Sequence, residues 1–243
     1  MSLSGAGSDA GELTFPPLLS GVAVHGPEDP FEKACALAAL GCDAGTVVYN
    51  LSANNVAAAI VFAPEVGRED AMAMLPLCGV GLQNALGALA PPEVAVHLAW
   101  DGGIRVNGAD CGRFRVAAAD SQSDDAPDWL VVGWTIPLMM TLDPGENPGI
   151  TALYEEGCAD VDAGQLVESW ARHALVWINR WTEAGNRPLH AEWLGLVPDV
   201  GEDIRILGRS GTFVGTDDRF GMLLREGTKT NVIALSALLG DTP

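Results

Sequence analysis

The stretch VAVHLAWDGGIRVNGADCGRFRVAAA, residues Val94–Ala119, decides the fold because it encodes three short strands joined by two tight turns. Apolar residues alternate with others through Val94–Leu98, as in a strand with one buried face. Asp101-Gly102 and Asn107-Gly108 supply the residues that tight hairpin turns demand, because glycine adopts positive φ without a Cβ clash. The alternation resumes at Phe114–Val116, which completes the third strand.

The first of these strands brings His97, Trp100 and Asp101 together at its end, ahead of a loop. Such a position often carries chemistry, since a rigid sheet can aim side chains from a loop. The simpler alternative is an edge hairpin in which Asp101 only starts the turn. The pattern alone leaves both interpretations open.

The same stretch resembles the core of the biotin/lipoate protein ligase superfamily, in which a strand carries a lysine and, four residues later, an aspartate. His97 stands at the position of the lysine, and Asp101 keeps the aspartate. Cys111-Gly112 falls at the family's small-residue and glycine step, with Arg113 directly after it. The resemblance therefore marks His97 and Asp101 as candidate catalytic residues.

The next predicted strand, Trp129–Leu138, resembles the strand that follows in this family. Gly133 matches the family's first glycine, whereas Thr135 and Pro137 replace its second glycine and its asparagine. Upstream, Asp29-Pro30-Phe31 occupies the place of the family's Ser-Thr-Asn signature.

A further departure concerns the loop Asn50–Asn55, which in active biotin ligases is rich in arginine and glycine and closes over the adenylate. Here it contains neither residue type. Activating a carboxylate with ATP places phosphate beside carboxylate, so the site needs fixed cations. Asn54 and Asn55 can donate hydrogen bonds, but they cannot neutralise a phosphate. The sequence therefore predicts weak ATP binding or none.

The ligand site that the resemblance implies lies between the Val94–Trp100 strand, the Trp129–Leu138 strand and the loop before Val56. Gly112 would let a ligand chain approach the backbone, while Trp100, Trp134 and Arg113 could fill part of the space. A tryptophan side chain that packs in this space would bury some 150–250 Å² of surface there. We expect a reduced pocket, lined by Trp100 and Trp134 and polar at His97 and Asp101.

The predicted fold class is α+β, with a mixed or mostly antiparallel sheet, packed helices and a small SH3-like β domain at the C-terminus. The expected organisation is a disordered tail at 1–12, a ligase-like domain at 13–190 and a small β-barrel domain at 191–243. Four short strands between Asp203 and Leu235 carry the last of these.

Two helices have clear starts. Asp29 caps the first, with Pro30 at its first position, and the helix ends at Gly41. Asp162 caps the second, which carries a stripe of tryptophans that suits a core or a homodimer interface. Arg68–Ala90 predicts a long apolar helix with a kink at Pro76.

Composition limits the function classes. The net charge of −19 argues against a nucleic-acid-binding surface, which needs clustered Lys and Arg. The chain has no evident signal sequence or membrane-spanning run, and its five cysteines form no CxxC pair. These features predict a cytoplasmic protein with reduced thiols and no membrane partner.

Three functions remain open. The first is a ligase-like enzyme that activates a carboxylated ligand, with biotin, lipoate and ATP implied by the resemblance, and passes it to an acceptor protein domain. The second is a ligand-binding or interaction protein on the same fold. The third is an ATP-independent acyltransferase that uses Cys158 as nucleophile and His97 as base. The alternative for Cys158 is a small buried or loop thiol.

Overall fold

The computed structural model describes residues 13–121, 125–140, 147 and 149–240; the predicted disordered tail at 1–12 lies outside these ranges. The helices are α1 (Pro30–Ala39), α2 (Arg68–Ala71), α3 (Met74–Leu89), α4 (Ala163–Ala184) and α5 (Asn186–Leu194), with a 3₁₀ helix, η1 (Leu235–Gly240). The strands are β1 (Ser20–Ala23), β2 (Thr46–Leu51), β3 (Asn55–Phe62), β4 (Val96–Leu98), β5 (Gly103–Val106), β6 (Ala109–Ala118), β7 (Leu130–Pro137), β8 (Asp203–Ile206), β9 (Arg209–Thr216), β10 (Met222–Glu226) and β11 (Lys229–Ile233).

A seven-stranded sheet forms the centre of the molecule, with the strand order β1-β2-β3-β7-β6-β5-β4. β1 pairs with β2 in parallel, and the other neighbours pair antiparallel. The three strands predicted from Val94–Ala119 are present as β4, β5 and β6. The α+β class with a mixed, mostly antiparallel sheet is confirmed.

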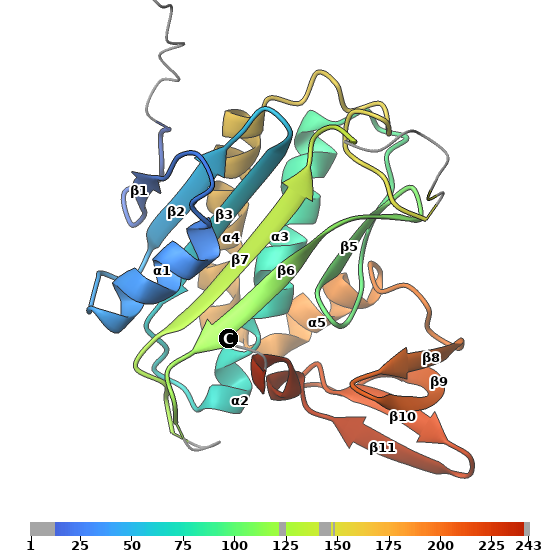
Figure 1. Cartoon of the computed structure of the whole chain (residues 1–243). Coiled ribbons are helices and arrows are strands. Elements are labelled where there is room, and N and C mark those ends of the chain that lie inside the picture. Colours follow the sequence, from blue (N-terminus) through green and yellow to red (C-terminus); the bar gives the residue numbers. More distant parts are fainter. Residues whose placement is uncertain (1–12, 122–124, 141–146, 148, 241–243) are drawn as a thin grey trace, which may run out of the picture.

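The helices cover the two sides of this sheet unequally (Figure 1). α3 and α4 pack on one side, where the larger core cluster lies. On the other side α1 alone covers β2, β3 and β7, over a smaller cluster that includes Phe31 and Val131. The uncovered part of that second side, over β4, β5, β6 and the start of β3, is called the open face below.

Both predicted helix starts are confirmed. The Asp29 side chain accepts a hydrogen bond from Phe31 N, and Pro30 is the first residue of α1. The Asp162 side chain accepts one from Gln165 N at 2.8 Å, at the start of α4. Each carboxylate satisfies a backbone N–H that has no partner within its helix.

The long helix predicted for Arg68–Ala90 is two helices, and its predicted kink at Pro76 is wrong. The break between α2 and α3 falls at Met72-Ala73, and Pro76 is the third residue of α3. Proline is tolerated there because the first turn needs no backbone donor. By length and composition Arg68–Leu89 could cross a membrane, yet 72% of its most apolar window is buried, as in a core helix.

The small C-terminal β domain is confirmed as a four-stranded antiparallel sheet in the order β11-β10-β9-β8. Within the described residues, no pairing joins β8 to β11, so the sheet is open at both edges. It is reached through α5, a helix that the sequence pattern does not predict. Phe220, in the turn between β9 and β10, is fully buried and accepts a hydrogen bond from Trp100 Nε1 at 2.7 Å, which ties this sheet to the main one.

Candidate functional site

The alternation of β6 decides which residues reach the open face. Arg113 lies opposite Thr135 in β7, and Arg115 lies opposite Gly133. A Cβ at Gly133 would lie 2.8 Å from the Phe31 ring, so this set of positions faces α1. The side chains between them face α3 and α4 instead. The open face therefore carries both arginines of β6.

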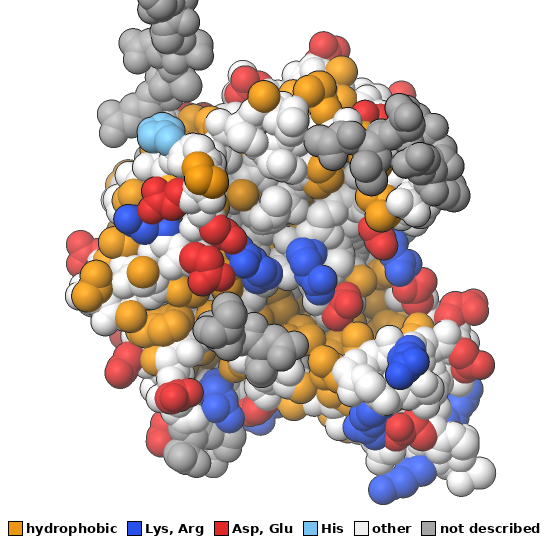
Figure 2. All heavy atoms as spheres, in the orientation of Figure 1, with side chains coloured by type: hydrophobic (Ala, Val, Ile, Leu, Met, Phe, Trp, Pro, Cys, Tyr) orange, Lys and Arg blue, Asp and Glu red, His pale blue; other side chains and the backbone are white. Residues whose placement is uncertain are grey.

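The neighbouring strands β4 and β5 add to this set. His97 in β4 pairs with Arg105 in β5. Gly103, two residues before Arg105, pairs with Arg113 in β6. Ile104 and Val106, which alternate with Arg105, are buried in the core on the other side. His97 and the three arginines 105, 113 and 115 thus share one side of the sheet. Figure 2 shows this side of the molecule, with basic and acidic side chains interspersed near its centre.

Two of the three guanidinium groups are neutralised by carboxylates. Arg115 donates to Asp29 Oδ1 at 2.7 Å and to Glu32 Oε1 at 3.3 Å, and it lies over the Phe31 ring at 4.3 Å. Glu32 therefore pairs with Arg115. These ion pairs hold α1 against β6.

Arg105 is held by Asp110 at 3.3 Å and by Asp199 at 2.9 Å. These hydrogen bonds and charges, that of Asp199 first, raise the pKa of the Arg105 guanidinium. Arg105 thus remains charged, but its charge is already balanced within the protein. It also links β5 to the segment that leads into the C-terminal sheet.

Arg113 differs from both. It is exposed, and its only hydrogen bond among the described residues goes to the Asp101 backbone carbonyl at 3.5 Å. No described carboxylate forms an ion pair with it. The Asp101 carboxylate instead accepts a hydrogen bond from Gly103 N in the turn. Arg113 therefore presents a guanidinium group that is available to an anion.

The asparagines that precede β3 lie at the edge of the same face. Asn55 is exposed and opposite Pro137, and the Asn54 carbonyl accepts a hydrogen bond from Leu138 N at 2.7 Å. The backbone of this loop is therefore tied to the end of β7. Asn54 and Asn55 lie on the side of β7 away from β6, with Thr135 and Ala57 between them and Arg113.

The expected tryptophan lining is wrong, because both indoles lie on the other side of the sheet. Trp134 is opposite Phe114, is 2% exposed and packs edge-on against Trp170 in the core beneath α4. Trp100 is 3% exposed and reaches towards Phe220 of the C-terminal sheet. A strand alternates its side chains, so Trp134 cannot share a face with its neighbours Gly133 and Thr135.

Cys158 is fully buried in the core cluster on the α3 and α4 side. Burial and the Glu156 carboxylate raise the pKa of its thiol. His97 lies on the opposite side of the sheet, so the structure does not bring the two together. Within the described residues, no group of three or more His, Cys, Asp or Glu side chains is arranged to hold a metal ion.

The structure thus brings together His97, Asp101, Gly112 and Arg113, with Asn54 and Asn55 at the far edge. Sequence reasoning missed Arg105, Arg115 and Asp29 as parts of this face. One signal was present: Arg113 and Arg115 are two residues apart in a strand, so they share a side.

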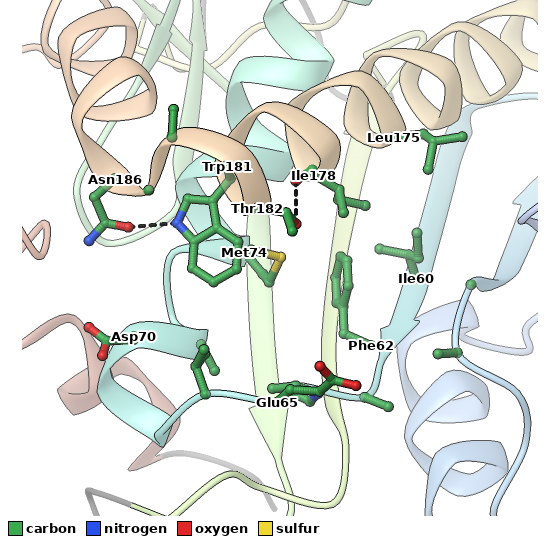
Figure 3. Close-up of a pocket in the computed structure, with 18 of the residues that line it drawn as sticks. Ile60, Phe62, Glu65, Asp70, Met74, Leu175, Ile178, Trp181, Thr182 and Asn186 are labelled. Atoms are coloured by element: carbon green, nitrogen blue, oxygen red, sulfur yellow. Dashed lines mark hydrogen bonds between the residues drawn. The ribbon is translucent and has the colours of Figure 1, made fainter.

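A second feature is a groove of about 1120 Å³ on the other side of the sheet (Figure 3). The end of β3, the start of α3 and the second half of α4 form its walls, and the turn around Asp218 and Arg219 closes one end. The hollow beside Trp100, by contrast, measures about 20 Å³. The groove near α4 is therefore large enough for a ligand, whereas the hollow beside Trp100, where the sequence predicts a pocket, is not.

Comparison with known proteins identifies the fold. Residues 15–195 match the biotin/lipoate A/B protein ligase family, and residues 200–241 match a domain of unknown function, DUF4444. A crystal structure of a biotin protein ligase-like protein of unknown function from Silicibacter sp. TM1040 is 57% identical, covers 95% of this chain and 100% of its own, and has a TM-score of 0.90.

More distant structures share the fold alone. Biotin protein ligase from Aquifex aeolicus is 16% identical over 89% of this chain and 96% of its own, with a TM-score of 0.71. The structure of that protein in complex with biotin and ATP is 16% identical over 88% of this chain and 95% of its own, with a TM-score of 0.69. No curated protein sequence matches the chain.

Proposed function

Because the chain belongs to the biotin/lipoate A/B protein ligase family, we propose that it binds a small carboxylated ligand of the biotin or lipoate class on its open face. The single observation that carries this proposal is Arg113, an exposed guanidinium group with no carboxylate partner among the described residues. A planar guanidinium group pairs well with a carboxylate through two parallel hydrogen bonds. Arg113 would thus supply a permanent cation for this contact.

The floor beside Arg113 suits a ligand chain. Ala57 and Thr135 are its neighbours across β7 and β3, and both have short side chains. Asn55 lies beyond them and offers an amide to a polar ring. A ligand that pairs with Arg113 would therefore extend across small residues towards the loop before β3.

The same face does not fit a triphosphate. Arg115 and Arg105 are each paired with two carboxylates, so the cations of this face are outnumbered by nearby acidic groups. A single carboxylate can pair with Arg113, whereas ATP would bring several negative charges against Asp29, Glu32 and Asp101. The proposal is therefore ligand binding without adenylation. The Aquifex aeolicus protein, in contrast, is described in complex with biotin and ATP.

Calorimetry with biotin and with lipoate tests the proposal. Arg113→Gln should weaken binding about tenfold or more, since a charge-assisted hydrogen bond contributes about 1.5–3 kcal/mol. Arg205→Gln in β8, an exposed arginine of the other sheet, is the matched control and should bind like the wild type. The methyl ester of biotin should bind the wild type more weakly than biotin does, by a similar factor. Equal affinity of acid and ester, or no binding by the wild type, would refute the proposal.

Adenylation is tested with ATP and Mg²⁺ in the same calorimeter. We expect no saturable binding at micromolar ATP, and no mass increase of a biotin acceptor domain incubated with the protein, biotin and ATP. A micromolar dissociation constant for ATP, or a biotinylated acceptor, would restore the ligase function and refute binding without catalysis.

His97 remains our candidate for the position of the family lysine. The imidazole lies on the same side of the sheet as Arg113. His97→Ala should therefore weaken the binding of biotin about twofold to tenfold, since a hydrogen bond contributes about 0.5–1.5 kcal/mol. Unchanged affinity in His97→Ala would show that the imidazole has no part in binding.

The ATP-independent transferase has less support. A nucleophilic cysteine needs a thiolate and access to its substrate. Cys158 is buried, and its thiol pKa is raised.

A further inference from the structure

We propose that the groove beneath the second half of α4 binds a long-chain carboxylic acid, at a site separate from the open face. Its volume of about 1120 Å³ is on the scale of ligand pockets, which run to roughly 1,000 Å³. β3 separates the two sites, because Ile60 lines the groove while its neighbour Ala59 faces α1. The inference therefore does not rest on the proposed function.

The walls of the groove are apolar and come from three elements (Figure 3). Ile60 and Phe62 lie on β3, Met74 lies at the start of α3, and Leu175, Ile178 and Trp181 lie on α4. The Trp181 indole is fixed as part of the wall, since its Nε1 donates to Asn186 Oδ1 at 2.6 Å. Such a wall suits an unbranched hydrocarbon chain better than a polar ligand.

Besides the apolar residues of α4 that pack in the core, a second row of apolar residues on this helix faces the groove. Trp170, Ala174 and Trp177 are buried against α3, where Gly81 meets the Ala174 backbone. Leu175 and Ile178, on the adjoining stripe, are only partly buried, because no element of the chain covers them from the groove side in the described structure. Nearby Leu18 is 71% exposed. The groove therefore leaves large apolar side chains in water unless a ligand covers them.

Most polar groups of the lining lie at one end of the groove, at the seam with the C-terminal sheet, whereas the Glu65 carboxylate lies below Phe62, away from Asn186 (Figure 3). At the seam Arg219 pairs with Asp70 at 3.2 Å, and Asn186 Nδ2 donates to the Asp218 carbonyl at 3.0 Å. Arg187, also at this end, is exposed and forms no ion pair with any described residue. An apolar groove with Arg187 at one end is complementary to an acyl chain whose carboxylate lies at that end, away from Glu65.

The test uses the full chain and fluorescence titration with dansyl-undecanoic acid, followed by displacement with palmitic acid. Wild type should bind the probe saturably, and biotin should not displace it. Thr182→Trp places a large side chain at the groove mouth and should weaken binding at least about tenfold. Val176→Trp is the matched control, because Val176 is on the same helix, is 60% exposed and does not line the groove. It should bind like the wild type.

The head group is tested separately. Arg187→Gln should weaken the binding of palmitic acid about tenfold and leave the binding of its methyl ester unchanged. Arg180→Gln, on α4 but outside the groove, should change neither. Ile178→Trp, from within the wall, serves as a second blocking variant if Thr182→Trp does not fold.

Three results would overturn the proposal. The first is no saturable binding by the wild type, and the second is equal loss in Thr182→Trp and Val176→Trp. The third is a dimer of the wild type, measured by light scattering, that Thr182→Trp converts to a monomer. That result would make the groove an interface between two copies of the chain.

Discussion

Gly112 restricts substitution more than any other residue of the open face. Its φ is +118°, and a Cβ would lie 2.1 Å from the Thr135 carbonyl oxygen in β7. Two independent reasons, the backbone conformation and the neighbouring strand, therefore demand glycine here. The packing of β6 against β7 therefore explains why a glycine occupies this family position, whether or not a ligand lies nearby.

Gly112→Ala should therefore destabilise the protein by about 3 kcal/mol or more, because strain at positive φ adds to a steric collision. Gly108→Ala separates these two effects, since Gly108 has a φ of +92° but open space around a Cβ. It should cost only about 1–2 kcal/mol. Urea unfolding measures both. Equal destabilisation would mean that β7 moves aside at no cost.

Cys158 should react slowly with iodoacetamide at neutral pH. Its pKa is raised, so the thiol remains protonated through neutral pH and gains thiolate only at more alkaline pH, and burial also blocks access. We expect alkylation at least about tenfold slower in the native protein than in urea. Mass spectrometry of the peptide measures the rates. Glu156→Gln removes a carboxylate that raises the pKa and should speed the reaction at a given pH.

A native rate for Cys158 equal to the unfolded rate would contradict this prediction and favour the transferase alternative. Cys42 provides an internal control, because it is only partly buried and should react before Cys158 does. If both thiols react together, the native fold opens on the timescale of the experiment.

At the scale of elements, the sequence predicts helix starts well because a cap is local chemistry. Asp29 and Asp162 cap the helices as predicted, each through a bond within three residues. The sequence does not predict that Asp29 also binds Arg115, 86 positions away. Nor does it predict the break at Met72-Ala73 or the helix α5, because tertiary packing rather than a local signal decides them.

Asp29 therefore has two roles that substitutions can separate. Asp29→Asn keeps an acceptor at the start of α1 and should cost little stability, whereas Asp29→Ala should cost about 1 kcal/mol. Both substitutions leave Arg115 with Glu32 alone, so both should strengthen the binding of biotin on the open face.

Thermal unfolding and calorimetry measure these two effects of Asp29. Equal destabilisation by Asn and Ala would show that Asp29 stabilises the fold through its ion pair rather than as a cap. Unchanged affinity for biotin in both variants would show that Arg115 lies outside the ligand site.

At the scale of the whole molecule, the sequence predicts the strands but not which faces meet. The alternation of Arg113 and Arg115 is visible in the chain, whereas their meeting with Asp29 depends on the strand order. The prediction from the sequence accordingly assigns Trp100 and Trp134 to the wrong side of the sheet. The family resemblance predicts the fold correctly, and the charges of the open face become visible only in three dimensions.

The two sheets of the molecule meet at Phe220, and that contact decides whether they unfold together. The ring is fully buried, 5.8 Å from Trp193 and 5.4 Å from His190 between ring centroids. Phe220 also has a φ of +64°, an unusual conformation for a bulky residue, which the contact with Trp100 holds in place.

Phe220→Ala should remove about 3–5 kcal/mol from the docking of the C-terminal sheet, as for other buried phenylalanines. Hydrogen exchange should then quicken in β9 and β10 while β3 and β7 keep their protection, because most of the core residues around β3 and β7 lie outside the C-terminal sheet. Val232→Ala, at a residue of the same small sheet that is 55% exposed, is the control and should change neither. Exchange that rises equally in both sheets would show that the chain unfolds as one unit. That result would contradict the predicted division into two domains at residue 190.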